Sequence, residues 1–128
     1  YYSEIGLGID FTARDVQQVQ KQKGLPWEIA KAFDGSAPIG RFMPVDQFTD
    51  LKNIYFHLLK NGQMQQQGHS ADMMYSFDAI IHYVSQFFTL RVGDLIYTGT
   101  PAGVSKVEIG DVLEGFIGQE KMLHCEVK

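Results

Sequence analysis

Residues 5–17 read IGLGIDFTARDVQ, and this stretch decides how the chain begins to fold. Apolar residues alternate with glycine over residues 5–9, which predicts a β-strand with room for a close backbone neighbour. Asp10 follows at the carboxyl end of that strand. Thr12 and Asp15 then have the spacing of a capping box, with aspartate in place of the usual glutamate or glutamine. We therefore expect a helix to begin here, with Thr12 as its cap.

The helix would place two further polar side chains beside Asp10. Arg14 and Gln17 are three residues apart and share one helical face. The break Gly24-Leu25-Pro26-Trp27 follows, and a short turn or helical piece over residues 28–33 presents Lys31. These groups could converge on a ligand, but the same residues also describe an ordinary strand end, a surface charge and a solvated amide.

Length and composition bound the remaining choices. At 128 residues the chain suits a single domain over residues 1–128 with a substantial core. The formal net charge of -4 gives no basic footprint, which argues against nucleic acid and membrane surfaces as partners and leaves small charged metabolites. The lone Cys125 excludes an intrachain disulfide and fits a reducing compartment. With no apolar run of spanning length, the predicted location is the cytoplasm.

The rest of the chain predicts a β-rich α+β domain. Residues 54–59 form a candidate strand, Asn61-Gly62 is a strong two-residue hairpin signal, and residues 63–67 are its returning, glutamine-rich edge strand. Ser76 can cap a helix that runs to residue 87, and its apolar stripe predicts core packing. Residues 95–98 read as a buried strand that leads into a glycine-rich loop over residues 99–103. Two strands, 112–116 and 122–127, complete the predicted fold.

The candidate chemistry centres on oxygen ligands. Gly99 and its neighbours would let backbone N–H groups approach an anion, and Thr100 is the hydroxyl we select there. An ordinary turn is the alternative. The four histidines lack zinc-site spacing, and no nucleophile elbow is present. Asp10 is the best single ligand for a hard cation such as Mg²⁺, although the chain offers no obvious second carboxylate for it.

Several motifs taken together resemble the fumarylacetoacetate hydrolase family. They are DFTARDVQ, KGLPWEIAKAFD, APIGRF, the NGQ hairpin with DMMYS downstream, RVGDLIYTGTPAGV and GDVLEG, and they cover almost the whole chain in order. GLPWEIAK is most similar to the acylpyruvase and oxaloacetate decarboxylase branch. The resemblance implies a mixed β-sandwich roll with short helices, a divalent metal (Mg²⁺, with Mn²⁺ or Ca²⁺ as alternatives) and a homodimer.

The resemblance also implies roles for particular residues. Asp10 matches the family's aspartate metal ligand, and Lys31 matches the lysine that faces the carboxylate and enolate oxygens of the substrate. Thr100, beside Gly99, matches the threonine that holds the substrate carboxylate. The remaining matches are Arg14 and Gln17, which line the site, and Glu114, which aligns with a glutamate that partners a catalytic histidine.

The chain also departs from the family pattern. Family members supply two more metal ligands from a Glu-x-Glu strand and a His-x-x-Glu lid upstream of the DFTARD motif, and neither is present. We therefore hypothesise that this chain is the C-terminal portion of a longer enzyme.

The implied reaction is metal-dependent cleavage of a carbon–carbon bond in a 2,4-dioxo acid, through a pyruvate enolate. Decarboxylation of oxaloacetate and isomerisation of a hydroxy-diene-dioate use the same kind of site and stay open. The alternative from another class is a non-catalytic dimeric module.

Overall fold

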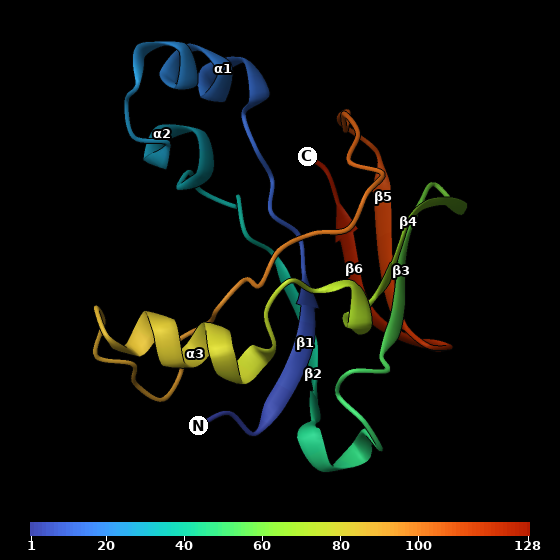
Figure 1. The fold of residues 1–128 in the computed structure, drawn as a ribbon. Coiled ribbons are helices and arrows are strands. Elements are labelled where there is room, and N and C mark those ends of the chain that lie inside the picture. Colours follow the sequence, from blue (N-terminus) through green and yellow to red (C-terminus); the bar gives the residue numbers. More distant parts are fainter. The chain divides into compact units, whose positions relative to one another are not determined.

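The computed structural model describes residues 1–128, with six strands, three α-helices and two short 3-10 turns. The chain divides into two compact units, one made of residues 1–7 and 40–128 and the other of residues 8–39. Figure 1 gives the order of the elements in each. Strands outnumber helices and the helices are short, so the expected α+β, predominantly β class is confirmed.

A four-stranded antiparallel sheet forms the larger part of the first unit (Figure 1). Its strands are β3 (Tyr55–Lys60), β4 (Gln63–His69), β5 (Val112–Ile117) and β6 (Glu120–Glu126), in the order β4-β3-β5-β6. Asn61 and Gly62 join β3 to β4 with φ of 52° and 75°. These left-handed values are those of a two-residue hairpin turn, so the predicted hairpin and the edge position of β4 are both confirmed.

Burial alternates along β5 and defines the two faces of this sheet. Leu113, Gly115 and Ile117 are buried, whereas Val112, Glu114 and Phe116 are only half-buried. The inner face is therefore the one that carries Leu113, Gly115 and Ile117, and the outer face is the one that carries Glu114 and Phe116.

A second sheet pairs β1 (Glu4–Gly8) with β2 (Ile39–Pro44). The strand before Asp10 was expected from the sequence, but β2 was not. Gly40 shows why glycine is required in β2, since a Cβ there would lie 2.1 Å from the carbonyl oxygen of Met122. The backbones of β2 and β6 therefore approach one another more closely than any side chain would permit.

The core of this unit gathers apolar side chains from both sheets. Ile54, Ile117 and Met122 are its buried centre, and Leu113 and Leu123 are 2% and 3% exposed. Partly buried side chains pack against that centre from β1, β2, β3, the segment between β2 and β3, and α3: Ile5, Leu7, Met43, Phe48, Leu51, Phe56 and Phe77.

Helix α3 (Phe77–Ser85) begins as the sequence predicts. The Ser76 hydroxyl accepts a hydrogen bond from the Ala79 amide at 3.2 Å, which is the expected cap. The helix ends at Ser85 rather than at residue 87. Its apolar stripe was expected to be core, but only Phe77 packs against the buried centre, and Phe88 is 67% exposed.

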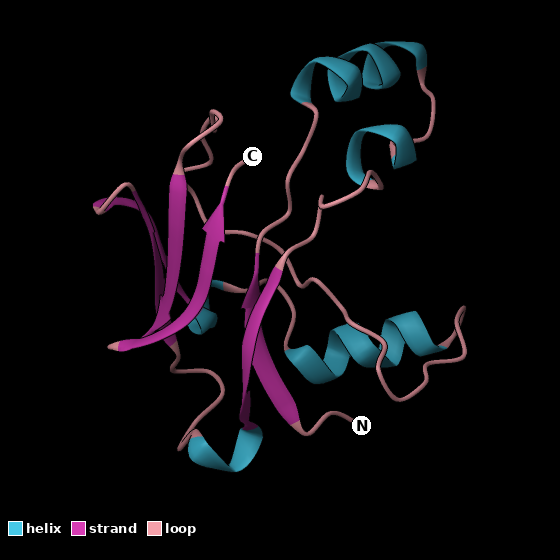
Figure 2. Cartoon of the chain, turned by 180° about the vertical axis from the view of Figure 1, so that it is seen from behind, coloured by secondary structure: helices cyan, strands magenta, loops and turns pink.

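The strand predicted at residues 95–98 is wrong. This segment lies outside both sheets, and Figure 2 draws it as loop between α3 and β5. Leu95 and Tyr97 are 50% and 43% exposed. A short apolar run makes a strand only where a neighbouring strand exchanges backbone hydrogen bonds with it, and neither sheet includes this segment.

The second unit carries α1 (Arg14–Lys23) and α2 (Glu28–Lys31). Thr12 does not cap α1, because the helix begins one residue too late: Ala13 is the N-cap residue, and no side chain caps it. Gly24 ends α1 in the left-handed conformation at φ 64°, as glycine commonly does. No helix in the structure is long and apolar enough to cross a membrane.

Candidate functional site

Backbone hydrogen bonds in the second unit bring two distant stretches of sequence together. The Phe11 amide donates to the Ser36 carbonyl at 2.8 Å, and the Ala13 amide donates to the Ala30 carbonyl at 3.0 Å. Ala30 is fully buried. These bonds fix the residue after Ala30, which is Lys31, next to the segment that follows β1.

Lys31 consequently reaches Asp10 and Thr12. Its ammonium group donates to Oδ2 of Asp10 at 2.5 Å and to the hydroxyl of Thr12 at 2.8 Å. Both charged side chains remain accessible, with 31% exposure for Lys31 and 47% for Asp10. Lys31 bonds only one of the two carboxylate oxygens of Asp10, namely Oδ2. The cluster therefore presents one cation and one accessible carboxylate to an incoming molecule.

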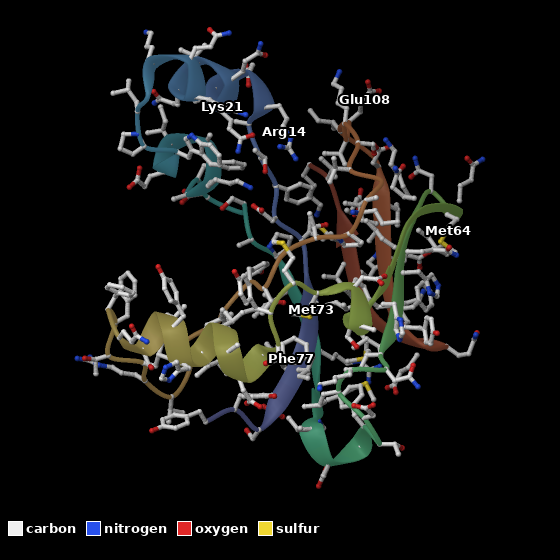
Figure 3. All side chains as sticks on the ribbon, viewed as in Figure 1. Arg14, Lys21, Met64, Met73, Phe77 and Glu108 are labelled. Atoms are coloured by element: carbon white, nitrogen blue, oxygen red, sulfur yellow. The ribbon has the colours of Figure 1, made fainter.

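Arg14 and Gln17 form a second polar pair in this unit. The guanidinium of Arg14 donates to Oε1 of Gln17 at 3.0 Å, as their spacing on one helical face predicts. Figure 3 labels Arg14 at the start of α1. The pair is exposed, and the amide group holds the guanidinium in one orientation.

Thr100 lies in the first unit, in a loop held against β4. Nε2 of Gln66 donates to the Thr100 hydroxyl at 3.0 Å and to the Pro101 carbonyl at 3.0 Å. Nε2 of Gln65 donates to the Gly103 carbonyl at 2.7 Å. Gly99 at the start of this loop has φ of 117°, which favours glycine because side chains rarely tolerate it.

Glu114 belongs to a cluster of ionisable side chains on the outer face. Its carboxylate pairs with the Lys121 ammonium and lies 3.8 Å from Nδ1 of His124. The Lys121 hydrogen bond, and more weakly the charge of His124, lower the pKa of Glu114. Glu114 lies on the outer face, whereas Gln66, which holds Thr100, lies on the inner face. The structure does bring together the glutamate and a histidine, but it does not bring them to Thr100.

The carboxylate of Asp10 is suited to serve as one oxygen ligand of a hard divalent cation. Such a cation takes carboxylate oxygens, and Mg²⁺ commonly uses one or two carboxylates together with water and substrate oxygens. No three His, Cys, Asp or Glu side chains in this chain are grouped to hold a metal. Asp10 is therefore the one carboxylate ligand that these residues offer there, with Lys31 already supplying a positive charge beside it.

Sequence reasoning missed two polar contacts. Thr12 was interpreted as a helix cap, but its hydroxyl accepts from Lys31. The sequence predicts Gln66 only as part of a glutamine-rich edge strand, but its side chain donates a hydrogen bond to the Thr100 hydroxyl. The available signal was its position: a glutamine at an inward-facing place in a strand needs a hydrogen-bonding partner.

Comparison with known proteins agrees with this fold. The model of the fumarylacetoacetate (FAA) hydrolase C-terminal family matches residues 5–127. The chain belongs to the fumarylacetoacetate hydrolase family.

Individual relatives share this similarity over part of their length. The oxaloacetate tautomerase YcgM of Escherichia coli is 48% identical over 84% of this chain and 50% of its own length. A mitochondrial oxaloacetate decarboxylase of Dictyostelium discoideum is 40% identical over 99% of this chain and 59% of its own. The chain thus spans about half the length of the curated relatives it matches.

A solved structure shows the same architecture. The fumarylpyruvate hydrolase of Pseudomonas aeruginosa, crystallised with Mn²⁺ and pyruvate, superposes with a TM-score of 0.86 and 39% identity, over 95% of this chain and 52% of that one.

Proposed function

We propose that the protein carrying this chain is an enzyme that forms or stabilises the enolate of a small 2-oxo acid, with oxaloacetate as its first candidate substrate. The observation that carries this is the Lys31 ammonium, held by Asp10 and Thr12 and still accessible. The similarity to an oxaloacetate tautomerase and an oxaloacetate decarboxylase supports the choice of substrate.

Lys31 is the group we assign to the developing charge. In tautomerisation a proton leaves C3 of the 2-oxo acid and a proton is gained at the C2 oxygen, so negative charge develops on that oxygen. An ammonium placed there stabilises the charge where it forms, which is more effective than binding substrate and transition state equally. The bonds to Asp10 and Thr12 hold Lys31 in one orientation beforehand.

The remaining residues would bind and orient the acid. The Thr100 hydroxyl and the Gly99 backbone are assigned to the substrate carboxylate, and Arg14 and Gln17 to the lining of the site. Asp10 would hold a divalent cation, for which Mg²⁺ is the first candidate and Mn²⁺ or Ca²⁺ the alternatives. When bound, that cation would supply Lewis-acid polarisation of the substrate oxygens. The neighbour crystallised with Mn²⁺ and pyruvate supports a divalent metal.

A second candidate is hydrolysis of the carbon–carbon bond of a 2,4-dioxo acid. The similarity to a fumarylpyruvate hydrolase favours it. Water adds to the distant ketone, the bond breaks, and the pair of electrons leaves on the pyruvate enolate, so Lys31 would serve the same role. Decarboxylation of oxaloacetate gives the same enolate, and isomerisation of a hydroxy-diene-dioate needs similar charge stabilisation.

The experiment is a parallel assay of the protein with oxaloacetate and acetylpyruvate. Enol loss, pyruvate release and loss of the diketone absorbance are followed separately, with and without Mg²⁺. Faster keto–enol exchange without pyruvate release supports the tautomerase, whereas pyruvate from acetylpyruvate supports the hydrolase. Chelation should abolish either activity, and Mg²⁺ or Mn²⁺ should restore it.

The variant Asp10→Asn tests the metal assignment. Losing the ionised oxygen should weaken Mg²⁺ binding, measured by calorimetry, and reduce turnover while the melting temperature changes little. Asp34→Asn, in the exposed loop after α2, is the matched control and should change neither. If the wild-type protein binds no divalent cation and turns over neither acid, the non-catalytic dimeric module becomes the better description.

The proposed partners follow from the same chemistry. They are a small 2-oxo or 2,4-dioxo acid and a second copy of the chain, the homodimer being tested by sedimentation.

A further inference from the structure

Gln66 is a polar residue in an apolar layer. It pairs with Leu58, which pairs with the buried Gly115, so all three lie on the inner face of the sheet. An amide in such a position is costly unless its hydrogen-bonding groups have partners. Gln66 finds its partners in the loop that holds Thr100.

The chemistry of those partners fixes which end of the amide faces the loop. The Pro101 carbonyl oxygen can only accept a hydrogen bond, so the Gln66 group 3.0 Å from it must be the NH₂. The second N–H of that group is directed to the Thr100 hydroxyl, also at 3.0 Å. The Ala102 carbonyl is a longer, third acceptor at 3.5 Å, so the donors of Gln66 are used by three consecutive loop residues.

The loop is anchored close to β4 on either side of this contact. A Cβ at Gly103 would lie 2.5 Å from the Gln65 carbonyl oxygen, and Gly103 has φ of 98°. Gln65 also donates from its side chain to the Gly103 carbonyl at 2.7 Å. Any side chain at position 103 would push the loop off the strand.

The contact also determines how the Thr100 hydroxyl can be used. A hydroxyl carries one donor and two acceptor sites, and one acceptor site here is occupied by Gln66. Because the hydroxyl accepts in this bond, Gln66 leaves its proton uncommitted and turned away from the amide. That proton can be donated to an outside acceptor, and a carboxylate oxygen is a strong one.

We propose that Gln66 is a positioning residue, which orients the Thr100 hydroxyl as a donor to the substrate carboxylate. This role rests on the proposed function, because Thr100 is assigned there to the carboxylate. Gln66 itself does not touch the substrate. Replacing its NH₂ by an acceptor would let the Thr100 hydroxyl turn inward and donate to residue 66 instead.

The test compares two near-isosteric variants on the same strand. Gln66→Glu removes both donors and reverses the bond to Thr100, whereas Gln67→Glu makes the same charge change one residue away at an exposed position. Loss of the hydrogen bond from Thr100 to the substrate carboxylate should raise KM for oxaloacetate by about tenfold or more, because the bond involves a charged group. We expect that increase for Gln66→Glu with kcat nearly unchanged, since carboxylate binding is the same in substrate and transition state. Gln67→Glu should change neither constant.

A double-variant cycle separates positioning from mere structural support. Thr100→Val removes the hydroxyl and should raise KM by itself. If Gln66 acts through Thr100, the variant with both substitutions should have the KM of Thr100→Val alone. Gln66→Met, which removes the donors without adding charge, keeps the test available if Gln66→Glu does not fold.

Each other outcome has a definite meaning. If Thr100→Val raises KM but neither variant of Gln66 does, the role of Gln66 is overturned and the proposed function stands. Additive increases in the double variant also overturn it, because the two residues would then act independently. If Thr100→Val leaves KM unchanged, the carboxylate assignment of Thr100 fails as well. If the wild-type protein is inactive towards oxaloacetate and acetylpyruvate alike, the proposed function fails.

Discussion

Lys31 is held beside Asp10 and Thr12, and its ammonium group remains accessible to solvent. The side chain is 31% exposed and bonds Asp10 and Thr12 across 21 and 19 positions of sequence. Exposed ion pairs contribute only about 0–1 kcal/mol to stability, because water screens them and two long side chains must be ordered. The residue therefore has little structural value, and the cost of removing it should fall on function.

Lys31→Ala should lower kcat far more than it lowers stability. Loss of one preorganised donor at a developing oxyanion reduces kcat by about 10²–10³-fold in comparable sites. The melting temperature should stay close to that of the wild type. Mg²⁺ binding should be retained or tighter, because the ammonium beside Asp10 repels a second cation. Steady-state kinetics, calorimetry and thermal unfolding give the three readings.

Lys21→Ala is the matched control for this variant. Lys21 lies in the last turn of α1, in the same unit, and is labelled in Figure 3. It should leave kcat unchanged. Full activity in Lys31→Ala would remove Lys31 from the proposed mechanism, whereas equal losses in both lysine variants would indicate a general charge effect.

At the scale of the elements, the β3–β4 turn is tied to the start of β5. The Asp111 carboxylate accepts from Nδ2 of Asn61 at 2.7 Å and from the Glu108 amide at 2.8 Å, and Lys60 lies 3.0 Å away. These contacts, the Asn61 hydrogen bond first, lower the pKa of Asp111 from 3.8 to about 2. Oδ1 of Asn61 in turn accepts from the Val112 amide at 2.8 Å.

This network makes stability depend on acid pH in a defined direction. A carboxyl whose pKa is lower in the folded state stabilises the fold above its unfolded pKa and loses that effect as the pH falls through the folded value. The contribution of Asp111 should therefore be complete above pH 3.8 and decline between 3.8 and about 2. Asp111→Asn should lower the melting temperature at neutral pH, and the difference from wild type should narrow within that window.

Asp46→Asn provides the comparison, since Asp46 is exposed after β2. It should not reproduce the loss at neutral pH. A difference between Asp111→Asn and wild type that stays constant from pH 7 to the acid range would contradict the assigned network.

Local signals explain which elements the sequence predicts. The Asn61-Gly62 turn and the Ser76 cap depend on dihedral angles and on a hydrogen bond three residues away, so neighbouring residues determine them. The strand before Asp10 is likewise readable from its alternation. Contacts between distant residues are not readable in this way.

The missed features all depend on such distant partners. β2 exists because Ile39–Pro44 meets β1, and Gly40 fits against Met122 of β6. Residues 95–98 show the opposite case, a good local pattern without a neighbouring strand. In the site, the resemblance indicated Lys31 and Asp10 as functional residues, but the bond from Gln66 to Thr100 crosses 34 positions of sequence. No local rule predicts that pairing.

At the scale of the whole molecule, large aromatic side chains stay exposed around the end of α3. Tyr83, Phe87 and Phe88 are 64%, 66% and 67% exposed, and the rings of Tyr83 and Phe87 lie 5.3 Å apart. Val92, a few residues on, is fully exposed. Neighbouring apolar side chains of this size favour association, because burying them removes apolar area from water.

We therefore expect the 128-residue chain to self-associate as its concentration rises, through this aromatic end of α3. Replacing Phe87 and Phe88 together by serine should weaken the association by at least about tenfold, since burying one large apolar side chain contributes about 1.5–3 kcal/mol. Sedimentation velocity over a range of concentrations measures it. Met64→Ser is the control, because Met64 is 52% exposed on β4 (Figure 3) and lies outside this aromatic group. If Met64→Ser weakens association as much as the double replacement, the attraction is spread over the apolar surface. If the chain sediments as a monomer at every concentration, the exposed aromatics have no such role.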